Sequence, residues 1–518
     1  MISFMRRAIV AGRSPAPTMT LAEPPTSGRG ARLAARAEGL ATRRNATIAA
    51  ALAGIVVVGL FFGLQTYPNY DSYYQLIWGQ DLAHGRLPDY NVFRSPTPHP
   101  LSELVGLLLS PFGLAGDRLL VLITLVAWVG LLWAIYRFTK QLLGTLVAAV
   151  AVIVMLTRTD LEFFALRGVV DIWFLFFVFA AAALEVHRPR RGMPVMLLLV
   201  LAGLLRPEAW VLAGVYVLWL LPEKRIRGIW PYVLLAAAAP VLWLAWDWIV
   251  TGKPLYSLTS TRETAGEFKR NRGVVEAIKL VPDYVGANEK IVNVAIGGLG
   301  AVAALWVLRK RALIPLALMA LGVVTFLAIA AAGLSVIPRY LAVPSILFNL
   351  GVAFALTGWL VVREPRRVHR LLVALFVLTL LVGAWRAISI SKDFRKLHGQ
   401  EVFVRGQHTA LKAIFDDPKV VPLLSACRPI TTPTHSAIPV SRFVTGLPKG
   451  AFVASIAQTR PPRHGLLLIG NTFNFEPSAA RSTSGVSERS ARQWWSNYPL
   501  STFKFVAGNS HWRIYQNC

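Results

Sequence analysis

An aspartate stands directly after the first membrane-length apolar run of the sequence. Residues 46–64 are almost wholly apolar, and a helix of that length can cross a bilayer. The aromatic stretch 67–74 (Tyr-Pro-Asn-Tyr-Asp-Ser-Tyr-Tyr) follows and contains Asp71. A carboxylate at the edge of a membrane is costly to desolvate, which favours a functional role over a passive one. We therefore predict that Asp71 is the catalytic centre of a membrane enzyme.

Other charged residues lie where the predicted membrane segments end, on the same side as Asp71. Carboxylates beside cations at a lipid boundary suit the transfer of a sugar from a lipid phosphate. The base deprotonates an acceptor hydroxyl, and the cations hold the departing phosphate and stabilise its growing charge. The acidic residues on this side are Asp71, Asp81, Asp89, Asp160, Glu162 and Asp171, and the basic ones are Arg86, Arg94, Arg158, Arg167, Arg206, Lys253 and Arg339.

The composition is that of a polytopic membrane protein. Of the 518 residues, 55% are hydrophobic and 15% are charged, with a mean hydropathy of +0.52. Soluble domains are less apolar and carry more charge. The net charge of +28 comes from basic residues in short loops between apolar runs, which set the membrane topology and contact anionic lipid. We expect no nucleic-acid partner, because no basic, aromatic-interleaved soluble module is present.

The loop charges predict about eleven membrane-spanning helices. Loops rich in Lys and Arg are placed inside, which puts the N-terminus in the cytoplasm and a large first loop, residues 65–118, outside. Within that loop, the apolar segment 101–114 is short and broken by proline and glycine, so we predict an interfacial segment. The predicted spans are 46–64, 119–136, 143–156, 171–188, 193–205, 209–221, 230–250, 291–308, 312–334, 340–362 and 371–388.

Three regions follow from this pattern. Residues 1–45 are rich in arginine and proline without apolar periodicity, which is typical of a disordered cytoplasmic tail. Residues 46–391 form the transmembrane domain. Residues 392–518 are polar and contain short β-prone runs at 465–469 and 503–506, which predict a small extracytoplasmic α/β domain.

The two cysteines of the chain both lie in this last region. Cys427 and Cys518 belong to no CxxC motif or Cys/His cluster, which argues against a cysteine-based metal site. Outside the cytoplasm the pair could form a disulfide that ties the C-terminus to its domain, and two free thiols are the alternative.

Four stretches together resemble a known family of enzymes. Residues 71–88 (DSYYQLIWGQDLAHGRLP) are similar to the first-loop signature of integral-membrane glycosyltransferases of the GT-C fold. These enzymes include protein O-mannosyltransferases and the aminoarabinose transferase that acts on lipid A. Residues 95–101 (SPTPHPL) stand where many members have His/Lys-Pro-Pro-Leu, residues 167–171 (RGVVD) open a span, and residues 339–344 (RYLAVP) resemble a late Arg-Tyr-Leu-x-x-Pro motif. The resemblance covers residues 46–388.

The resemblance implies a polyprenyl-phosphate sugar donor and inversion at the anomeric carbon. The acceptor would be a cell-envelope glycan, lipid or protein outside the cytoplasm. It also implies Asp71 as the general base, with Asp171 in support. The usual lysine of the Lys-Pro-Pro segment is absent, so the cation for the phosphate is Arg94, Lys253 or Arg339. The candidate substrate-binding residues are Arg94, His99, Arg206, Glu208, Lys253, Arg339 and Tyr340.

A divalent metal is a second possibility raised by the resemblance. Residues 160–162 (Asp-Leu-Glu) are similar to the acidic second-loop motif of oligosaccharyltransferases, which bind a divalent ion. The carboxylates of Asp160 and Glu162 would suit Mg²⁺ or Mn²⁺. The better alignment of Asp171 favours the metal-free branch of the family.

Structural roles would also account for several of these residues. Asp171 could N-cap its helix, and His99 between two prolines could be a turn residue. The segment 206–208 could be a hairpin hinge with a local ion pair, and Lys253 an interface anchor. Arg339 could snorkel to the membrane interface. Asp247, which lies among tryptophans, is either a buried carboxylate of the site or part of an aromatic belt.

Two other classes of function compete with an enzyme. A glycolipid transporter or flippase would need charged residues deep in several spans, discontinuous helices and usually repeated halves. The short helices around residue 206 are the main feature of that kind in the sequence. A non-catalytic cell-envelope scaffold would use the C-terminal domain for binding.

Overall fold

The computed structural model describes residues 43–64, 66–224, 226–289, 291–363, 365–432, 434–458, 463–470 and 502–518. Of the predicted tail 1–45, residues 1–42 lie outside the described residues, and the last three begin the first described helix.

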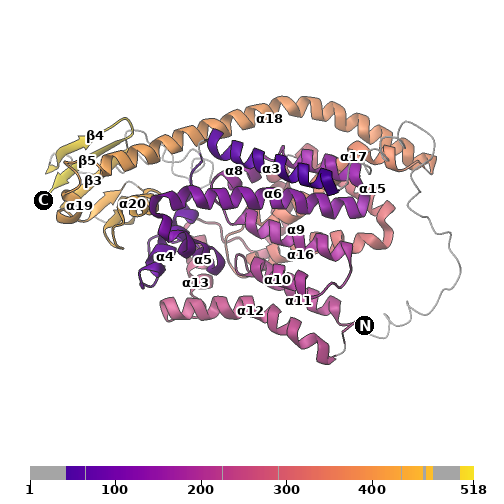
Figure 1. Cartoon of the computed structure of the whole chain (residues 1–518), viewed down its shortest axis with the longest axis horizontal. Coiled ribbons are helices and arrows are strands. Elements are labelled where there is room, and N and C mark those ends of the chain that lie inside the picture. Colours follow the sequence, from indigo (N-terminus) through magenta and orange to yellow (C-terminus); the bar gives the residue numbers. More distant parts are fainter. Residues whose placement is uncertain are drawn as a thin grey trace.

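A bundle of helices occupies most of the molecule, and a small sheet lies at one end of it (Figure 1). Each predicted span overlaps one of these helices. The helices are α3 (Arg43–Gly63), α4 (Tyr70–Ala83), α5 (Pro100–Leu109), η1 (Ser110–Ala115), α6 (Gly116–Leu143), α7 (Thr145–Met155), α8 (Thr159–Leu166), α9 (Asp171–His187), α10 (Met193–Gly203), α11 (Glu208–Leu220), α12 (Ile226–Thr251), α13 (Tyr256–Glu267), α14 (Val274–Glu289), α15 (Ile291–Leu308), η2 (Arg309–Ala312), α16 (Leu313–Ala331), η3 (Pro338–Leu341), α17 (Ala342–Val361) and α18 (Arg366–Phe415).

Several of these helices are long and apolar enough to cross a membrane. Five helical stretches among the described residues meet that test, or six if the bent pair α8 and α9 forms one span. Four shorter apolar helices lie in the same bundle, within α3, α7, α10 and α11. The chain joins α15 to α16 through η2, a turn that carries Arg309, Lys310 and Arg311. The number of about eleven membrane-spanning helices stays a prediction.

The burial of the helices separates the centre of the bundle from its surface. In α17, 89% of the apolar stretch is buried inside the protein, against 17% in α12 and in α18. Large apolar side chains on the outer helices are exposed, among them Leu234, Val302 and Leu381. Apolar surface of this extent needs a lipid environment. Helix α17 is therefore the core of the bundle, and α12 and α18 present apolar surface outwards.

Helices α4 and α5 cross closely within the predicted first outer loop. Gly79 of α4 and Gly106 of α5 meet at the crossing, and a Cβ atom on Gly79 would overlap the backbone of Gly106. Because neither glycine has a side chain, the backbones of the two helices can touch. The crossing holds α4 at the end of the bundle that faces the sheet, as Figure 1 shows.

Replacing Gly79 with alanine should push these two helices apart. Because the obstacle is backbone that cannot rotate away, we expect a loss of about 1–3 kcal/mol in the free energy of unfolding. Gly214→Ala is the matched control, since a Cβ atom there meets nothing within 4 Å. Thermal unfolding of the purified variants in detergent measures both, and equal melting temperatures for the two would contradict the close crossing.

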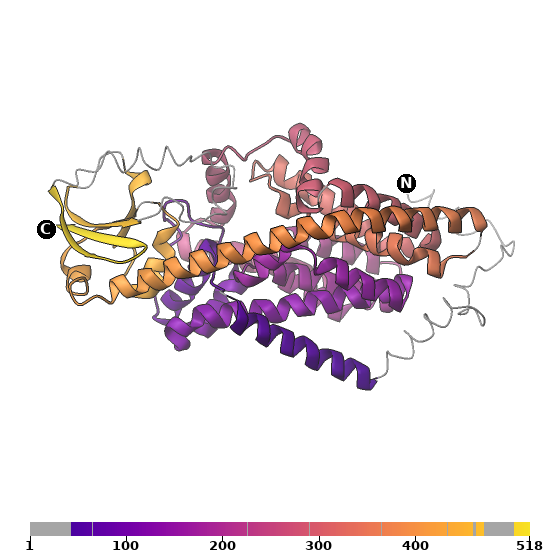
Figure 2. The same ribbon diagram turned by 90° about the horizontal axis from the view of Figure 1, so that it is seen from above.

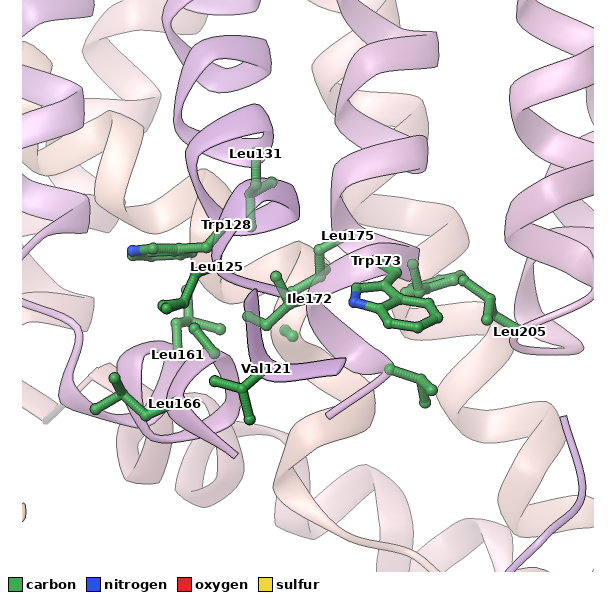
Figure 3. Packing of buried hydrophobic residues seen from close by; sticks show 14 of the residues in the cluster. Val121, Leu125, Trp128, Leu131, Leu161, Leu166, Ile172, Trp173, Leu175 and Leu205 are labelled. Carbon is green, nitrogen blue, oxygen red and sulfur yellow. The ribbon is translucent and has the colours of Figure 1, made fainter. Parts of the chain in front are cut away.

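The start of α9 is fixed by tight packing. Ile172 is buried beside Val121 and Leu125 of α6, and Trp173 is buried beside Leu205, as Figure 3 shows. The Trp173 Nε1–H also donates to the hydroxyl of Thr124 at 2.9 Å. Because interiors of this kind are close-packed, the residue that precedes this group, Asp171, has a well-defined position.

Helix α18 runs from the bundle into the C-terminal region without a break (Figure 2). The boundary expected between residues 391 and 392 falls inside this helix, because no proline interrupts it before residue 415. Glu401 of α18 forms a buried ion pair with Arg167, with Nε and Oε1 2.9 Å apart. This pair joins the extension of α18 to the loop between α8 and α9.

The C-terminal region contains a five-stranded mixed sheet with the strand order β2-β1-β3-β5-β4. Strand β1 pairs in parallel with β2 and β3, whereas β5 pairs antiparallel with β3 and β4. Strands and helices thus occur together in this region, and a small separate α/β domain outside the cytoplasm stays a prediction. The elements of this region are α19 (Leu423–Ala426), β1 (Ile430–Thr432), α20 (Ala437–Thr445), β2 (Phe452–Ala454), η4 (Ser455–Ala457), β3 (Gly465–Gly470), β4 (Lys504–Gly508) and β5 (Trp512–Asn517).

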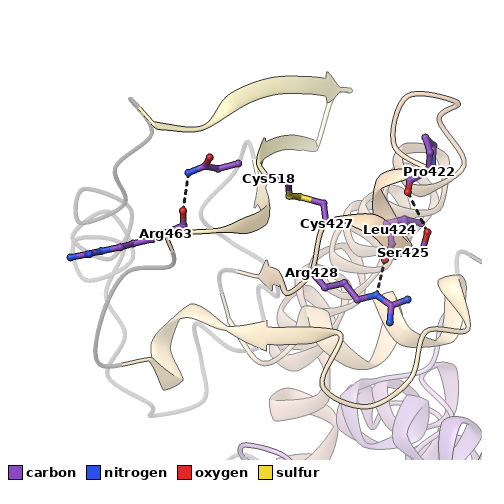
Figure 4. Close-up of a disulfide and its surroundings, with 8 residues drawn as sticks. Pro422, Leu424, Ser425, Cys427, Arg428, Arg463 and Cys518 are labelled. Carbon is purple, nitrogen blue, oxygen red and sulfur yellow. Dashed lines mark hydrogen bonds between the residues drawn. A yellow bond between two sulfur atoms is a disulfide. The ribbon is translucent and has the colours of Figure 1, made fainter.

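A disulfide joins Cys427 to Cys518, which is one of the two alternatives that the sequence left open, with the Cα atoms 5.8 Å apart (Figure 4). It connects the residue after α19 to the residue after β5 across a sequence separation of 91. Nearby, the Asn517 side chain donates to the carbonyl oxygen of Arg463 at 2.8 Å. The C-terminus is thus fixed to its domain by a covalent bond.

Removing this bond should destabilise the C-terminal domain. We expect Cys518→Ser to lower the free energy of unfolding by about 2–5 kcal/mol, because cross-linking a long loop restricts the unfolded chain. Cys518 is exposed, so the serine leaves no buried cavity. Denaturant unfolding of the purified protein measures the change. Ready alkylation of both cysteines in unreduced wild-type protein would contradict the bond and, with it, the oxidising compartment that we expect.

Candidate active site

Asp71 lies in the first turn of α4, and the loop between α8 and α9 fixes its position. The Asn69 side chain N-caps the helix and accepts from the Ser72 N–H at 2.8 Å. The Ser72 hydroxyl donates to the carbonyl oxygen of Gly168 at 2.8 Å. The start of α4 is thereby tied to the loop that leads into Asp171.

Asp171 is buried at the start of α9 and pairs with a buried arginine. Arg206, in the turn between α10 and α11, donates from Nη1 to Asp171 Oδ1 at 3.0 Å. Its Nε lies 3.5 Å from Oε1 of Glu208. The N-cap residue of α9 is Val170, so the alternative that Asp171 caps the helix is wrong. The charge of Arg206 is matched by two carboxylates.

Arg339 of η3 lies between the two aspartates. Its Nη1 is 3.9 Å from Oδ2 of Asp71 and 3.9 Å from Oδ2 of Asp171. The side chains of Asp71 and Arg339 are 33% and 32% exposed, whereas Asp171 is 3% exposed. Within the described part of the chain, the buried Nε atom of Arg339 has no hydrogen-bond partner. Asp71 and Arg339 therefore form the accessible side of the cluster, and Asp171 its buried side.

An apolar pocket adjoins these charges. Its walls come largely from α11, α16 and the start of α17, and its polar end contains the two arginines with Glu208 and Tyr340. The ring of Tyr340 lies 4.7 Å from the guanidinium carbon of Arg206 and 5.8 Å from that of Arg339. The apolar lining residues are Phe174, Leu212, Leu318, Leu321, Ala342 and Val343. Its free volume is about 20 Å³, roughly the room of one water molecule, so the pocket marks an apolar wall beside the charges and is not an open cavity.

The structure adds Arg270, which the sequence did not single out. It lies in the loop between α13 and α14, where Val336 N–H donates to its carbonyl oxygen at 2.9 Å. An isolated antiparallel bridge between Asn271 and Ser335 continues this pairing. The pairing brings Arg270 close enough for its charge to act on Asp71 and Arg339. Contacts between two separate loops produce this placement, and no local pattern in the sequence indicates it.

His99 is a neutral neighbour of the cluster. Burial and the charge of Arg206 lower the pKa of His99 to about 3, so the imidazole carries no charge at neutral pH. Its ring packs edge-to-face on Trp243, with centroids 5.7 Å apart. In the described residues its Nδ1 atom has no hydrogen-bond partner. His99 can therefore exchange a hydrogen bond with a ligand but cannot supply a positive charge.

Two of the predicted phosphate-binding cations are not paired with either aspartate in the described part of the chain. Arg94 pairs with Glu267 at 3.4 Å and stacks on Phe268, with its guanidinium carbon 4.5 Å from the ring centroid. Lys253 is exposed in the turn after α12, and the described part of the chain offers it no ion pair with Asp71 or Asp171. Of the three candidates, the structure brings only Arg339 to the two aspartates.

The acidic pair at 160 and 162 does not fit a metal site. Both oxygens of Asp160 accept hydrogen bonds from Arg158, at 2.8 Å and 2.6 Å. Over the residues that the structure describes, no three His, Cys, Asp or Glu side chains gather as metal ligands. We therefore derive no chemical step through Mg²⁺ or Mn²⁺. Asp247, the ambiguous acid among tryptophans, accepts from the N–H and hydroxyl of Ser257 at 2.8 Å and 2.7 Å, which is a structural role.

The electrostatic surroundings of Asp71 make it a stronger base than a free aspartate. Partial burial raises the pKa of Asp71, the negative charge of Asp171 raises it further, and Arg339 and Arg270 act in the opposite direction. The net direction is upward. A raised pKa makes the carboxylate a better proton acceptor.

Comparisons with known proteins give a match of structure but none of sequence. No protein-family model matches the chain, and no curated protein matches it significantly. The crystal structure of ArnT from Cupriavidus metallidurans bound to undecaprenyl phosphate aligns with a TM-score of 0.51 and 13% identity. The alignment covers 91% of this chain and 98% of that one.

Two structures of the oligosaccharyltransferase of Archaeoglobus fulgidus align less closely. One, tethered with an acceptor peptide, has a TM-score of 0.45 and 12% identity, covering 90% of this chain and 73% of that one. The other, AglB with an inhibitory peptide and a dolichol-phosphate, has a TM-score of 0.43 and 14% identity, covering 86% and 68%. The alignment with ArnT extends over almost the whole of both chains, and it shows that this chain has the same fold as ArnT, the GT-C fold that its sequence motifs resemble.

Proposed function

We propose that this chain is a membrane glycosyltransferase that moves a sugar from a polyprenyl-phosphate donor to an acceptor outside the cytoplasm. The observation that carries the proposal is the position of Arg339, 3.9 Å from both Asp71 and Asp171, at the polar end of an apolar pocket. A base, a cation for a phosphate and an apolar wall for a lipid chain thus adjoin one another. ArnT, which has the same fold, was crystallised with undecaprenyl phosphate.

The donor phosphate would bind to Arg339 and Arg270. Each has an Nε atom without a hydrogen-bond partner in the described residues. Arg206 is less suited, because Asp171 and Glu208 already occupy its donors. The prenyl chain would follow the apolar walls of the pocket, which gain from excluding water. Arg206 would act as a positioning residue that keeps Asp171 ionised and in place.

Transfer would proceed by a single displacement at the anomeric carbon. The acceptor hydroxyl gives its proton to the Asp71 carboxylate, and its oxygen attacks the anomeric carbon. The bond from that carbon to the phosphate oxygen breaks, and its electron pair leaves with the polyprenyl phosphate. Arg339 and Arg270 stabilise the charge that grows on the phosphate. Attack from the side opposite the leaving group inverts the configuration of the sugar.

The rate should depend on pH through Asp71. The base works only when ionised, and its pKa is raised, so kcat/KM should fall with decreasing pH at a midpoint above the value of about 3.9 of a free aspartate. Replacing Arg270 with glutamine removes a charge that lowers this pKa, so the midpoint should move to higher pH. Initial rates from pH 4 to 8 test both. A midpoint that moves to lower pH in the variant would contradict the role of Asp71 as base.

A deletion strain tests the proposed function in the cell. Cells that lack this chain should accumulate a cell-envelope glycan, glycolipid or glycoprotein that is missing one sugar residue. Wild-type protein should restore the product, and the Asp71→Asn variant should not. An unchanged glycan, glycolipid and glycoprotein profile, together with normal growth, would contradict the proposal. The mass of the missing residue would also identify the sugar.

A further inference from the structure

Three aromatic rings surround His435 beside the candidate active site. The centroid of the imidazole lies 5.3 Å from the ring of Tyr70, 6.0 Å from that of Phe93 and 6.5 Å from that of Phe268. We call these four residues the ring cluster. All four are half-buried, so each keeps part of its surface open. Arg94 adds a guanidinium group that stacks on both phenylalanines.

The ring cluster adjoins the proposed base. Tyr70 is the residue immediately before Asp71, whose carboxylate is one-third exposed. The hydroxyl of Tyr70 donates to the carbonyl oxygen of Arg94 at 2.9 Å, which fixes the ring. The four members come from the start of α4, the first outer loop, the residue after α13 and the C-terminal domain before α20. In Figure 1 helices α4, α13 and α20 lie at the end of the bundle next to the sheet.

Buried polar groups without partners accompany the rings. Among the described residues, neither Nδ1 of His435 nor the hydroxyl of Thr434 has a hydrogen-bond partner. Arg442 of α20, 5% exposed, has two such nitrogens, although its Nη2 lies 3.6 Å from Asp81. Buried polar groups are normally satisfied, and each exception calls for an explanation such as a bound molecule. The segment from 434 to 442 therefore offers hydrogen bonds that the protein itself does not use.

We infer that the ring cluster is an acceptor subsite for a carbohydrate, so that the C-terminal domain binds a glycan chain whose terminal hydroxyl reaches Asp71. The inference rests on the proposed function and adds the chemical class of the acceptor. The glycan can be free or attached to a lipid, because the same sugar chemistry would be recognised in both.

The chemistry of the cluster matches a sugar better than a peptide. The C–H faces of a sugar ring carry small positive charges and pack on the negative faces of aromatic rings. Hydroxyl groups both donate and accept hydrogen bonds, so one sugar can satisfy His435 and Thr434 together. An extended peptide commonly binds by adding a strand to a sheet edge. The edge strands here are β2 and β4, and neither contributes to the ring cluster.

The protonation state of His435 agrees with a neutral ligand. Burial and the charge of Arg94 lower the pKa of His435 to about 3. The imidazole is therefore neutral, with one nitrogen that donates and one that accepts. A phosphate or carboxylate ligand would accept a hydrogen bond from this ring but gain no charge pairing, whereas a hydroxyl group pairs with either nitrogen.

An acceptor competition tests the inference. Transfer from a polyprenyl-phosphate sugar is measured with two acceptor pools: oligosaccharides released by mild acid from the cell-envelope glycan, and peptides digested from envelope proteins. We expect the oligosaccharides to be modified. In His435→Ala and Phe93→Ala, the KM for the oligosaccharides should rise about tenfold or more, with a smaller change in kcat, because one hydrogen bond or one ring contact is lost.

Matched controls separate this site from other surfaces. His464→Ala and Phe505→Ala remove an exposed histidine and an exposed phenylalanine of the same domain and should leave KM unchanged. His511 lines a separate groove of about 530 Å³ between α18 and the turn before β5. A rise in KM with His511→Ala and none with His435→Ala would overturn the inference, as would transfer to the peptides alone. No turnover of any lipid donor by the wild type would instead overturn the proposed function.

Discussion

The Asp71→Asn variant should lose sugar transfer almost completely while remaining folded. Proton transfer by a positioned carboxylate contributes about 10²–10⁴-fold to a rate, and an amide cannot accept the proton. The side chain keeps its shape, and one-third of it is exposed, so little stability should be lost. The ratio of kcat/KM between wild type and variant, measured with lipid donor and acceptor, gives the effect.

A second aspartate on the same helix provides the control for this variant. Asp81 lies in α4 as well, but it pairs with Arg86 at 3.0 Å and with Arg442 at 3.6 Å, away from Arg339. Asp81→Asn should keep transfer within a few-fold of the wild type. If Asp71→Asn transferred sugar as fast as Asp81→Asn, another group would have to be the base.

Replacing Arg339 with glutamine should have the second largest effect on transfer. Its charge lies 3.9 Å from both aspartates at the accessible side of the cluster, where a leaving phosphate would gain charge. Removing one preorganised donor to such a group costs about 10²–10³-fold in kcat. Steady-state kinetics with the lipid donor measure the loss.

Two other arginines show whether the effect is specific to Arg339. Arg272 is an exposed arginine of the loop that contains Arg270, and its Nη1 lies 3.5 Å from Oε1 of Glu276. Arg272→Gln should therefore leave kcat nearly unchanged. Arg206→Gln should destabilise the protein by about 3–5 kcal/mol, because it leaves Asp171 and Glu208 buried without their cation. A normal kcat in Arg339→Gln would contradict the proposal that Arg339 binds the leaving phosphate.

The sequence predicts the helical architecture well because apolar length and loop charge are local signals. The start of α9 at Asp171 and the helices that flank Arg206 agree with the predicted segments within a few residues. No helix is predicted for the segment between the spans 230–250 and 291–308, but this segment contains α13 and α14. Amphipathic helices outside the apolar core lack the long apolar run on which the prediction depends.

The candidate site could be predicted only in part, because its members meet through tertiary contacts. The resemblance singled out Asp71, Asp171 and Arg339, and the structure brings these three together. The resemblance gave equal weight to Arg94, which pairs with Glu267, and to Lys253, which is exposed in the turn after α12. Charge and loop position are the same for all these cations, so the sequence contains no signal that separates them.

The groups that the sequence missed depend on pairs of distant segments. Arg270 reaches the site through the pairing of its loop with residues 335–336, and His435 reaches Tyr70 from the C-terminal domain. The unbroken helix α18 leads to that domain, whose helix α20 packs on α4 of the predicted first outer loop, with Arg442 and Asp81 3.6 Å apart. The polar composition after residue 392 indicated a separate region but gave no indication that a continuous helix joins it to the bundle.

One measurement addresses the central claim, which is that this site removes a sugar from a polyprenyl phosphate. Purified protein in liposomes is given a panel of labelled polyprenyl-phosphate hexoses and pentoses, the oligosaccharide acceptors, and in parallel the corresponding nucleotide sugars. We predict that label leaves at least one lipid donor, that polyprenyl phosphate is released in equal amount, and that Asp71→Asn abolishes both. Transfer from a nucleotide sugar with no loss of label from any lipid donor would contradict the account.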